Sequence, residues 1–194
     1  FDDSTLNVEK TNSDRSGVVW GSGIGGMRTF YNESIGFERN NGIPRFNPFF
    51  IPKLISDIPA GHISIKYNFK GPNFTTVSAC ASSTNALIDA FNYIKWNKAD
   101  IFITGGSEAC IFEPGIAGFN AMQALSTKNN NPKTASRPFD KDRDGFVMGD
   151  GAGILILEEY EHAKKRNANI LAEIIGYGSS GDAHHITSPP DDGN

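Results

Sequence analysis

Short apolar runs, separated by stretches of helical periodicity, constrain the fold of this chain most strongly. The runs at residues 17–21, 74–77, 100–104 and 153–157 are rich in residues that favour buried strands. A further strand is predicted at residues 170–177. Strands that alternate with helices indicate the α/β class, with a mostly parallel or mixed sheet.

The segments between these runs carry helical periodicity or turn residues. Residues 63–67 alternate as in a strand, whereas Ile55, Ile58 and His62 share one helical face, and we predict a helix there. Helices are predicted at residues 27 to about 35, 55–67, 82 onwards, part of 111–125, and 158–166, with a loop at 36–53 and a tight turn at Gly105 and Gly106.

Composition excludes several classes of function. With 194 residues and 38% hydrophobic content, the chain can form one sizeable core or a large part of a two-part fold. The net charge of -4, without a long basic run, argues against nucleic acid as a partner. No apolar run approaches the roughly 20 residues of a membrane span, so a soluble protein is expected. The absence of an initial Met and the turn-rich end predict a fragment.

Cys80 lies between a predicted strand and a predicted helix. Ser82 and Ser83 can cap that helix, whose apolar positions recur at helical spacing. A helix N-terminus favours thiolate over thiol, so this position suits a nucleophile. The alternative is a small buried apolar residue, and Cys110, the other cysteine, fits that alternative better. Two cysteines in a chain of this length also indicate a reducing, intracellular setting.

A cysteine nucleophile usually needs a histidine, and no histidine of this chain identifies itself as the partner. His162 is expected on a solvated helix face, and His62 is expected to be a core residue with a hydrogen-bonded ring. His184 and His185 are adjacent and could line a site, but neighbouring side chains do not converge on a helix.

Two further motifs have weaker interpretations. Gly21, Gly23 and Gly26 match the dinucleotide-binding pattern, but a glycine turn that lets backbone approach a neighbouring element is favoured. Residues 140–145 imitate the start of a calcium loop, but position 12 holds Gly151 instead of Glu. We expect its acids to pair with arginines and backbone, and predict no metal.

Several motifs in the same order resemble the β-ketoacyl-[acyl carrier protein] synthases, most closely the type II elongating enzymes. The resemblance runs from about residue 17 to residue 194. Its motifs are Thr76-Val77-Ser78-Ala79-Cys80-Ala81-Ser82-Ser83, Ala124-Leu125-Ser126-Thr127, Ser136-Arg137-Pro138-Phe139-Asp140, Asp144-Gly145-Phe146-Val147-Met148-Gly149-Asp150-Gly151-Ala152-Gly153 and His185-Ile186-Thr187-Ser188-Pro189-Pro190.

The resemblance implies a thiolase-like layered α/β fold, of which residues 1–194 are most of the N-terminal half, in a homodimeric enzyme. It implies that Cys80 is the nucleophile, which holds an acyl group as a thioester, and that its backbone N–H is one oxyanion-hole donor. Malonyl carrier protein would then lose carbon dioxide and attack this thioester. The family's catalytic histidines lie in later motifs that are absent here, so this fragment alone is expected to be inactive.

The resemblance also implies roles for six other residues. Ile24, Phe50 and Phe119 would line the acyl pocket, with Phe50 reaching across the dimer. Contacts to the pantetheine arm or to acyl carrier protein are expected from Thr187, Ser188 and Arg45, although Gln123 stands where some relatives have a basic docking residue. No cofactor is expected, and the location is a bacterial cytoplasm or an organelle of bacterial descent.

Three alternatives stay open from the sequence. A polyketide-type ketosynthase would share the fold. A non-catalytic dimer partner of a ketosynthase would typically lack the active cysteine, so Cys80 argues against it. A nucleotide-binding dehydrogenase is the remaining alternative, on the glycine pattern alone.

Overall fold

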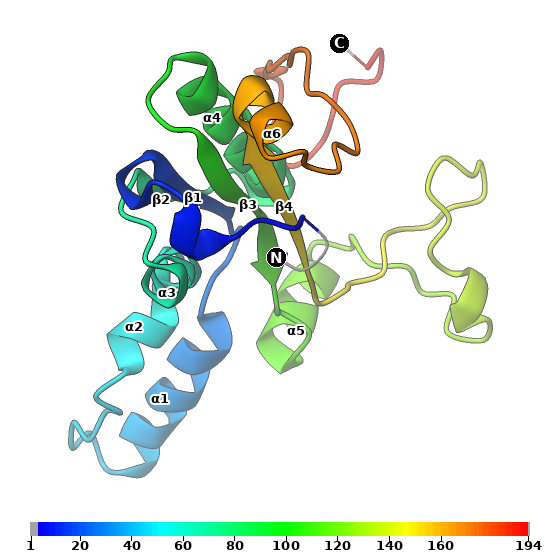
Figure 1. Ribbon diagram of the computed structural model, residues 1–194. Coiled ribbons are helices and arrows are strands. Elements are labelled where there is room, and N and C mark those ends of the chain that lie inside the picture. The colour runs from blue at the N-terminus through cyan, green and yellow to red at the C-terminus, as the bar shows by residue number, and fades with distance from the viewer. Residues whose placement is uncertain (1–3, 194) are drawn as a thin grey trace.

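The computed structural model describes residues 4–193 and contains one mixed four-stranded sheet in the order β2-β1-β3-β4 (Figure 1). The strands are β1 (Ser16–Gly21), β2 (Asn73–Thr76), β3 (Ile101–Glu108) and β4 (Gly151–Glu158). Strand β1 is parallel to both β2 and β3, whereas β4 is antiparallel to β3. The four predicted runs therefore all form strands of one sheet, and the predicted α/β class is confirmed.

In residues 4–193, six α-helices surround the sheet or extend from it. They are α1 (Met27–Arg39), α2 (Phe50–Leu54), α3 (Ile58–Tyr67), α4 (Ser82–Lys95), α5 (Glu113–Ala121) and α6 (Tyr160–Lys165), with 3-10 turns at Val8–Lys10, Ser13–Arg15, Ala79–Ala81 and Pro132–Thr134. Figure 1 shows α1 and α2 as an arm directed away from the sheet, and the loop after α5 projecting to another side. No helix in residues 4–193 has the length and apolar character of a membrane span.

The alternation of side chains along the central strands produces two cores. Val18 and Trp20 of β1 pack on one face with Ala60 of α3, whereas Val19 packs on the other face with residues of α4. Successive strand residues point to opposite faces, so a continuous apolar run is what a strand covered on both faces requires. The sheet is thus the middle of three layers, with α3 and α4 on opposite faces.

The predicted boundaries of the first helix and the following loop are wrong. Helix α1 continues past Gly36 to Arg39, and α2 begins inside the predicted loop and ends one residue beyond it. A single glycine costs a helix only about 1 kcal/mol, so Gly36 does not end it. The chain turns instead at Asn41 and Gly42, both of which have positive φ.

The tight turn predicted at Gly105 and Gly106 is also wrong, because β3 continues through both residues to Glu108. Gly105 has a φ of 147°, and a Cβ atom there would lie 2.1 Å from the Gly153 carbonyl oxygen of β4. The glycine therefore permits close approach of the neighbouring strand without ending β3.

The strand predicted at residues 170–177 is absent from the sheet. These residues have no regular secondary structure, and Leu171 and Ile175 are 78% and 90% exposed. Tyr177 instead packs on α4, where its hydroxyl accepts a hydrogen bond from Asn92 Nδ2 at 3.0 Å. Apolar alternation alone does not make a strand, since a strand also needs a neighbour that completes its backbone hydrogen bonds.

Candidate active site

Cys80 lies at the middle of a strained turn between β2 and α4. It is exposed, whereas Cys110 is buried. The preceding residue, Ala79, has a φ of 50°, a left-handed conformation that is unfavourable for a residue with a Cβ atom. Such outliers persist only where the surrounding structure enforces them, and they concentrate at functional sites. The predicted strand-to-helix corner is therefore present, with an accessible thiol on it.

Ser82 holds this turn in place, which differs from the predicted helix cap. Its Oγ accepts a hydrogen bond from the Ser78 backbone N–H at 2.9 Å and donates one to the Ala79 carbonyl at 2.7 Å. The Ser82 carbonyl accepts a further bond from the Thr76 hydroxyl at 2.8 Å. The buried serine thus links the end of β2 and the turn to the start of α4, and no side-chain cap bonds the first turn of that helix.

Glycines on the two central strands allow the start of α4 to lie directly on the sheet. Thr76, Gly21 and Gly106 are register partners across β2, β1 and β3. A Cβ atom on Gly21 would lie 2.5 Å from the Ser83 backbone nitrogen, and one on Gly106 would lie 2.1 Å from the Ser83 hydroxyl. Any larger side chain would displace the helix that follows Cys80.

The glycine-rich turn after β1 binds a carboxylate of its own chain. Glu108 accepts hydrogen bonds from the backbone N–H groups of Gly23 and Ile24 at 2.8 Å each, and from that of Gly25 at 3.3 Å. These are the donors that a phosphate would need in a dinucleotide site. A Cβ atom on Gly26 would lie 2.1 Å from the Lys53 carbonyl, so close backbone approach, the favoured interpretation, is confirmed.

Cys110 has the surroundings of a structural cysteine. It is 8% exposed, and burial raises the pKa of its thiol, with the neighbouring charges of Glu108 and Asp150 acting in the same direction. A raised pKa disfavours the thiolate, which is the nucleophilic form. The contrast with the exposed Cys80 agrees with the predicted difference between the two cysteines.

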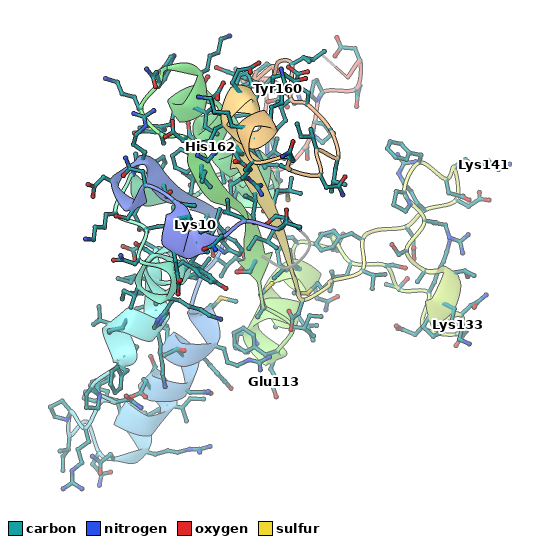
Figure 2. All side chains as sticks on the ribbon, in the orientation of Figure 1. Lys10, Glu113, Lys133, Lys141, Tyr160 and His162 are labelled. Atoms are coloured by element: carbon teal, nitrogen blue, oxygen red, sulfur yellow. The ribbon has the colours of Figure 1, made fainter. Side chains whose placement is uncertain are left out.

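Two expectations about the histidines are wrong. His62 is exposed on α3 and is no core residue. His162 is not simply solvated, because its Nδ1 atom lies 2.5 Å from the buried carboxylate of Glu158. In the described part of the chain no histidine forms a hydrogen bond or ion pair with Cys80. Figure 2 labels His162 on α6.

The three predicted acyl-pocket residues occupy separate elements. Ile24 lies in the glycine turn, Phe50 begins α2, and Phe119 lies near the end of α5. Ile24 is 39% exposed, Phe50 stacks on Phe46 with ring centroids 5.1 Å apart, and Phe119 meets Phe146 edge-on at 5.2 Å. The structure does not test their shared role, which stays a prediction.

The described part of the chain has clefts beside the start of α5 and beside the Cys80 turn. One of about 440 Å³ lies between α1 and the start of α5, and none of the three pocket residues lines it. The other, of about 400 Å³, adjoins the Cys80 turn and is lined by Thr76, Val77, Ser78, Asn85, Ile88, Asp89 and Ser179. Burial at this second cleft raises the pKa of Asp89, and Asn85 Nδ2 donates to the Ser78 hydroxyl at 2.6 Å.

The predicted carrier contacts lie on exposed segments. Arg45 is exposed in the loop between α1 and α2. Thr187 and Ser188 are exposed near the end of the chain, where both backbone N–H groups donate to the His185 ring at 3.2 Å. The structure does not test their predicted role.

The acidic loop pairs with backbone as predicted, since Asp140 accepts a hydrogen bond from the Asp142 N–H at 2.7 Å, but the predicted pairing with arginines is wrong. Asp144 accepts hydrogen bonds from the Ser126 hydroxyl at 2.6 Å and the Thr127 N–H at 3.0 Å, and the former, as the main cause, lowers its pKa. Across residues 4–193, no arginine forms an ion pair with the acids at 140–144, and no cluster of three or more His, Cys, Asp or Glu could hold a metal ion. Figure 2 shows Lys133 and Lys141 at the outer end of this projecting loop.

Cys80 was predicted from the sequence, whereas the bonding of Ser82 within the Cys80 turn and of Glu108 to the glycine turn was not. The roles of Ser82 and Glu108 depend on strand register, since Glu108 reaches the glycine turn only because β3 extends two residues beyond Gly106. One sequence signal points to Glu108: a glutamate ends an apolar strand in a chain that also has a glycine-rich turn. Only the strand register shows that this glutamate bonds to that turn.

A family model described as the N-terminal domain of beta-ketoacyl synthase matches residues 1–163. The mitochondrial 3-oxoacyl-[acyl-carrier-protein] synthase of Arabidopsis thaliana is 49% identical over 97% of this chain and 41% of its own length. The 3-oxoacyl-[acyl-carrier-protein] synthase 2 of Staphylococcus aureus is 51% identical over 98% of this chain and 47% of its own length. The chain thus spans less than half the length of these curated relatives.

Solved structures give the same result for the fold. A beta-ketoacyl synthase from Burkholderia phymatum superposes with a TM-score of 0.84 at 35% identity, over 96% of this chain and 45% of the other. A type II PKS ketosynthase, in complex with its acyl-carrier protein and bound to the hexaketide, gives a TM-score of 0.90 at 31% identity, over 96% and 47%. The predicted thiolase-like fold is confirmed, and the chain belongs to the beta-ketoacyl synthase family, whose N-terminal domain it carries.

Proposed function

We propose that Cys80 is the acyl-carrying nucleophile of a 3-oxoacyl-[acyl-carrier-protein] synthase of fatty acid biosynthesis. The observation that carries this proposal is an exposed thiol on a strained turn, directly before an α-helix and inside the matched family domain. The curated relatives that share about half of the residues of this chain bear that name.

In the proposed reaction, the Cys80 thiolate attacks the carbonyl carbon of an acyl group carried as a thioester on acyl carrier protein. A new carbon–sulfur bond forms to Cys80, and the carrier's thiol leaves. Malonyl carrier protein then loses carbon dioxide, and the resulting carbanion attacks the Cys80 thioester, which releases Cys80 and a chain two carbons longer. The Cys80 backbone N–H would stabilise the charge that develops on the carbonyl oxygen.

Decarboxylation would use groups of the whole protein that lie outside this chain. Within residues 4–193, none of the four histidines forms a hydrogen bond with Cys80, so we propose that residues 1–194 hold the acyl group and form most of one half of a two-part, homodimeric enzyme. The fragment alone would then not condense substrates. A bacterial cytoplasm or an organelle of bacterial descent is the proposed location, in keeping with the organisms of the relatives.

The acyl tail would be lined by Ile24, Phe119 and, across the dimer, Phe50. All three are apolar and none is fully buried, as lining residues should be. Thr187 and Ser188 would meet the pantetheine arm, and the exposed guanidinium of Arg45 would attract an acidic carrier protein.

A polyketide-type ketosynthase is the second candidate, because a solved structure of that kind has a TM-score of 0.90. Its 31% identity is well below the 49–51% of the fatty-acid relatives, which favours the first candidate. A non-catalytic partner is a third candidate, because one similar solved structure is a ketosynthase/chain length factor, and the presence of Cys80 argues against it.

The test is condensation by the full-length protein with Cys80→Ala, assayed with acyl and malonyl carrier protein. We expect the variant to form no 3-oxoacyl product, and the matched variant Cys110→Ala to keep the wild-type rate per folded molecule. Full activity in Cys80→Ala would contradict the mechanism. Failure of the wild type to extend acyl chains, with extension of polyketide intermediates instead, would favour the second candidate.

A further inference from the structure

We infer that Glu108 is a positioning residue, whose carboxylate fixes the Gly23–Gly25 turn against the Cys80 turn and so sets both nucleophile geometry and acyl-chain selectivity. The inference rests on the proposed function for the identity of the acyl substrate. It starts from the three backbone hydrogen bonds that the Glu108 carboxylate accepts from Gly23, Ile24 and Gly25.

The register explains how Glu108 reaches this turn. Gly106 of β3 is the partner of Gly21, the last residue of β1, so β3 continues for two residues after β1 has ended. Side chains two residues apart on a strand point to the same face, so Glu108 lies on the face where Gly106 meets the start of α4. On this face, the half-buried carboxylate lies beyond the end of β1, where the glycine turn begins.

The glycine turn also contacts the strained residue before the nucleophile. A Cβ atom on Gly23 would lie 3.0 Å from a Glu108 carboxylate oxygen and 3.4 Å from the Ala79 carbonyl oxygen. Gly23 therefore lies between Glu108 and Ala79 in one packed group. A shift of the turn would alter the support for the left-handed conformation of Ala79 and, through it, the position of Cys80.

A carboxylate suits this position because it only accepts hydrogen bonds. One Glu108 oxygen accepts from Gly23 and Ile24, and the other accepts from Gly25. Glutamine would keep the size of the side chain but would present an NH₂ group to at least one backbone N–H, which leaves two donors facing each other. The substitution would loosen the turn without creating a cavity.

The substrate consequence follows from Ile24, which this turn carries and which is 39% exposed. If Ile24 contacts the acyl tail, its position sets how well the site distinguishes long from short chains. Loosening the turn should therefore change the selectivity between long and short acyl chains, while most of the protein stays folded. Small displacements of positioning groups have large effects on rate.

The experiment compares full-length wild type, Glu108→Gln and the control Glu9→Gln, which changes an exposed glutamate in the first 3-10 turn. Two quantities are measured: the rate of Cys80 alkylation by iodoacetamide, followed by peptide mass spectrometry, and the ratio of kcat/KM for tetradecanoyl and octanoyl carrier protein. We expect Glu108→Gln to shift the ratio about tenfold and to change the alkylation rate, with Glu9→Gln unchanged.

Glu108→Asp provides a second test should Glu108→Gln fold poorly, because it keeps the carboxylate and shortens its reach. An intermediate shift in the ratio is expected. A wild-type ratio and a wild-type alkylation rate in the folded fraction of both variants would overturn the inference. Absence of acyl transfer to Cys80 in the wild type would instead refute the proposed function. The results therefore distinguish failure of the inference about Glu108 from failure of the proposed function.

Discussion

Two thiols in this chain have opposite surroundings. Cys80 is exposed on a turn that begins with the strained Ala79, whereas Cys110 is 8% exposed, with a pKa raised by burial and by two nearby carboxylates. Reactivity requires both access and thiolate, and Cys110 lacks access and disfavours the thiolate. The difference is set by position in the fold, since the two side chains are chemically the same.

Alkylation should therefore separate the two cysteines. We predict that iodoacetamide at neutral pH labels Cys80 at least about tenfold faster than Cys110, because only the thiolate reacts and burial opposes it at Cys110. Labelling of Cys110 should rise only at alkaline pH, since its pKa is raised. Timed peptide mapping of the native protein would measure both rates. Equal labelling of the two sites would contradict the assignment.

Close packing against a neighbouring element requires glycine at position 21 but not at position 36. A Cβ atom on Gly21 would meet the backbone of Ser82 and Ser83 at 2.5 Å, but one on Gly36 would meet nothing within 4 Å. Backbone cannot move aside as a flexible side chain can, so the start of α4 would have to shift.

We predict that Gly21→Ala lowers the free energy of unfolding by about 1–3 kcal/mol, the usual cost of overpacking, and alters the alkylation rate of Cys80. The matched control Gly36→Ala should raise it by about 0.5–1 kcal/mol, because alanine favours the helix interior. Chemical denaturation of both variants gives the comparison. A harmless Gly21→Ala would show that the helix does not rest on this glycine.

At the scale of elements, one buried carboxylate joins β4 to α6. Glu158 accepts hydrogen bonds from Arg166 Nη2 at 2.6 Å and lies 2.5 Å from His162 Nδ1, and Arg166 also donates to the Ser4 carbonyl. Desolvation raises the pKa of Glu158, but the hydrogen bonds from Arg166 and His162 outweigh it, and the net shift is downward.

Glu158→Gln should lower the free energy of unfolding by about 2 kcal/mol near pH 7, because it leaves the Arg166 guanidinium without its partner charge. A lowered pKa means that this stabilisation is present above the unfolded value of about 4.3 and is lost as pH falls through the lower folded value. The difference between variant and wild type should therefore shrink below about pH 4.

Denaturation at pH 7 and at pH 3 to 4 would check this prediction. The control is Glu161→Gln, in which the lost carboxylate is 62% exposed and forms a surface ion pair with Lys164, so no measurable change is expected at either pH. A destabilisation by Glu158→Gln that stays constant across this pH range would show that the charge of Glu158 is not its cause.

The elements that the sequence predicts correctly are those that depend on the local order of apolar and polar residues. Continuous apolar runs gave the four strands, and the thirteen-residue α1 was recognised at its start but not at its end. The failures at Gly105, at residues 170–177 and at Glu108 share one cause. Each depends on which segment lies alongside, and strand register is a tertiary property that periodicity does not contain.

At the scale of the whole molecule, many large apolar side chains are exposed. Ile154 and Leu155 of β4 are 59% and 52% exposed, Leu171 and Ile175 are more exposed still, and the α1–α2 arm presents Phe30, which is 53% exposed. Large apolar side chains that gather at a protein surface mark contact surfaces. The relatives are more than twice as long as this chain, so we expect the remainder of the protein, and a second subunit, to cover them.

The isolated 194-residue chain should therefore bind more of the dye ANS per molecule than the full-length protein, although the latter is larger. Apolar surface, rather than chain length, determines the signal. Fluorescence titration of both proteins at equal molar concentration is the measurement. A lower signal from the isolated chain would indicate that it covers these residues by itself.

Peptide mapping after acyl transfer tests most directly whether Cys80 carries the acyl group. Full-length protein is incubated with octanoyl carrier protein and no malonyl donor, then digested at acidic pH to preserve thioesters. We predict one added octanoyl group, located on the peptide that contains Cys80 and absent in Cys80→Ala. An acyl group on Cys110, or transfer that persists in Cys80→Ala, would contradict the account.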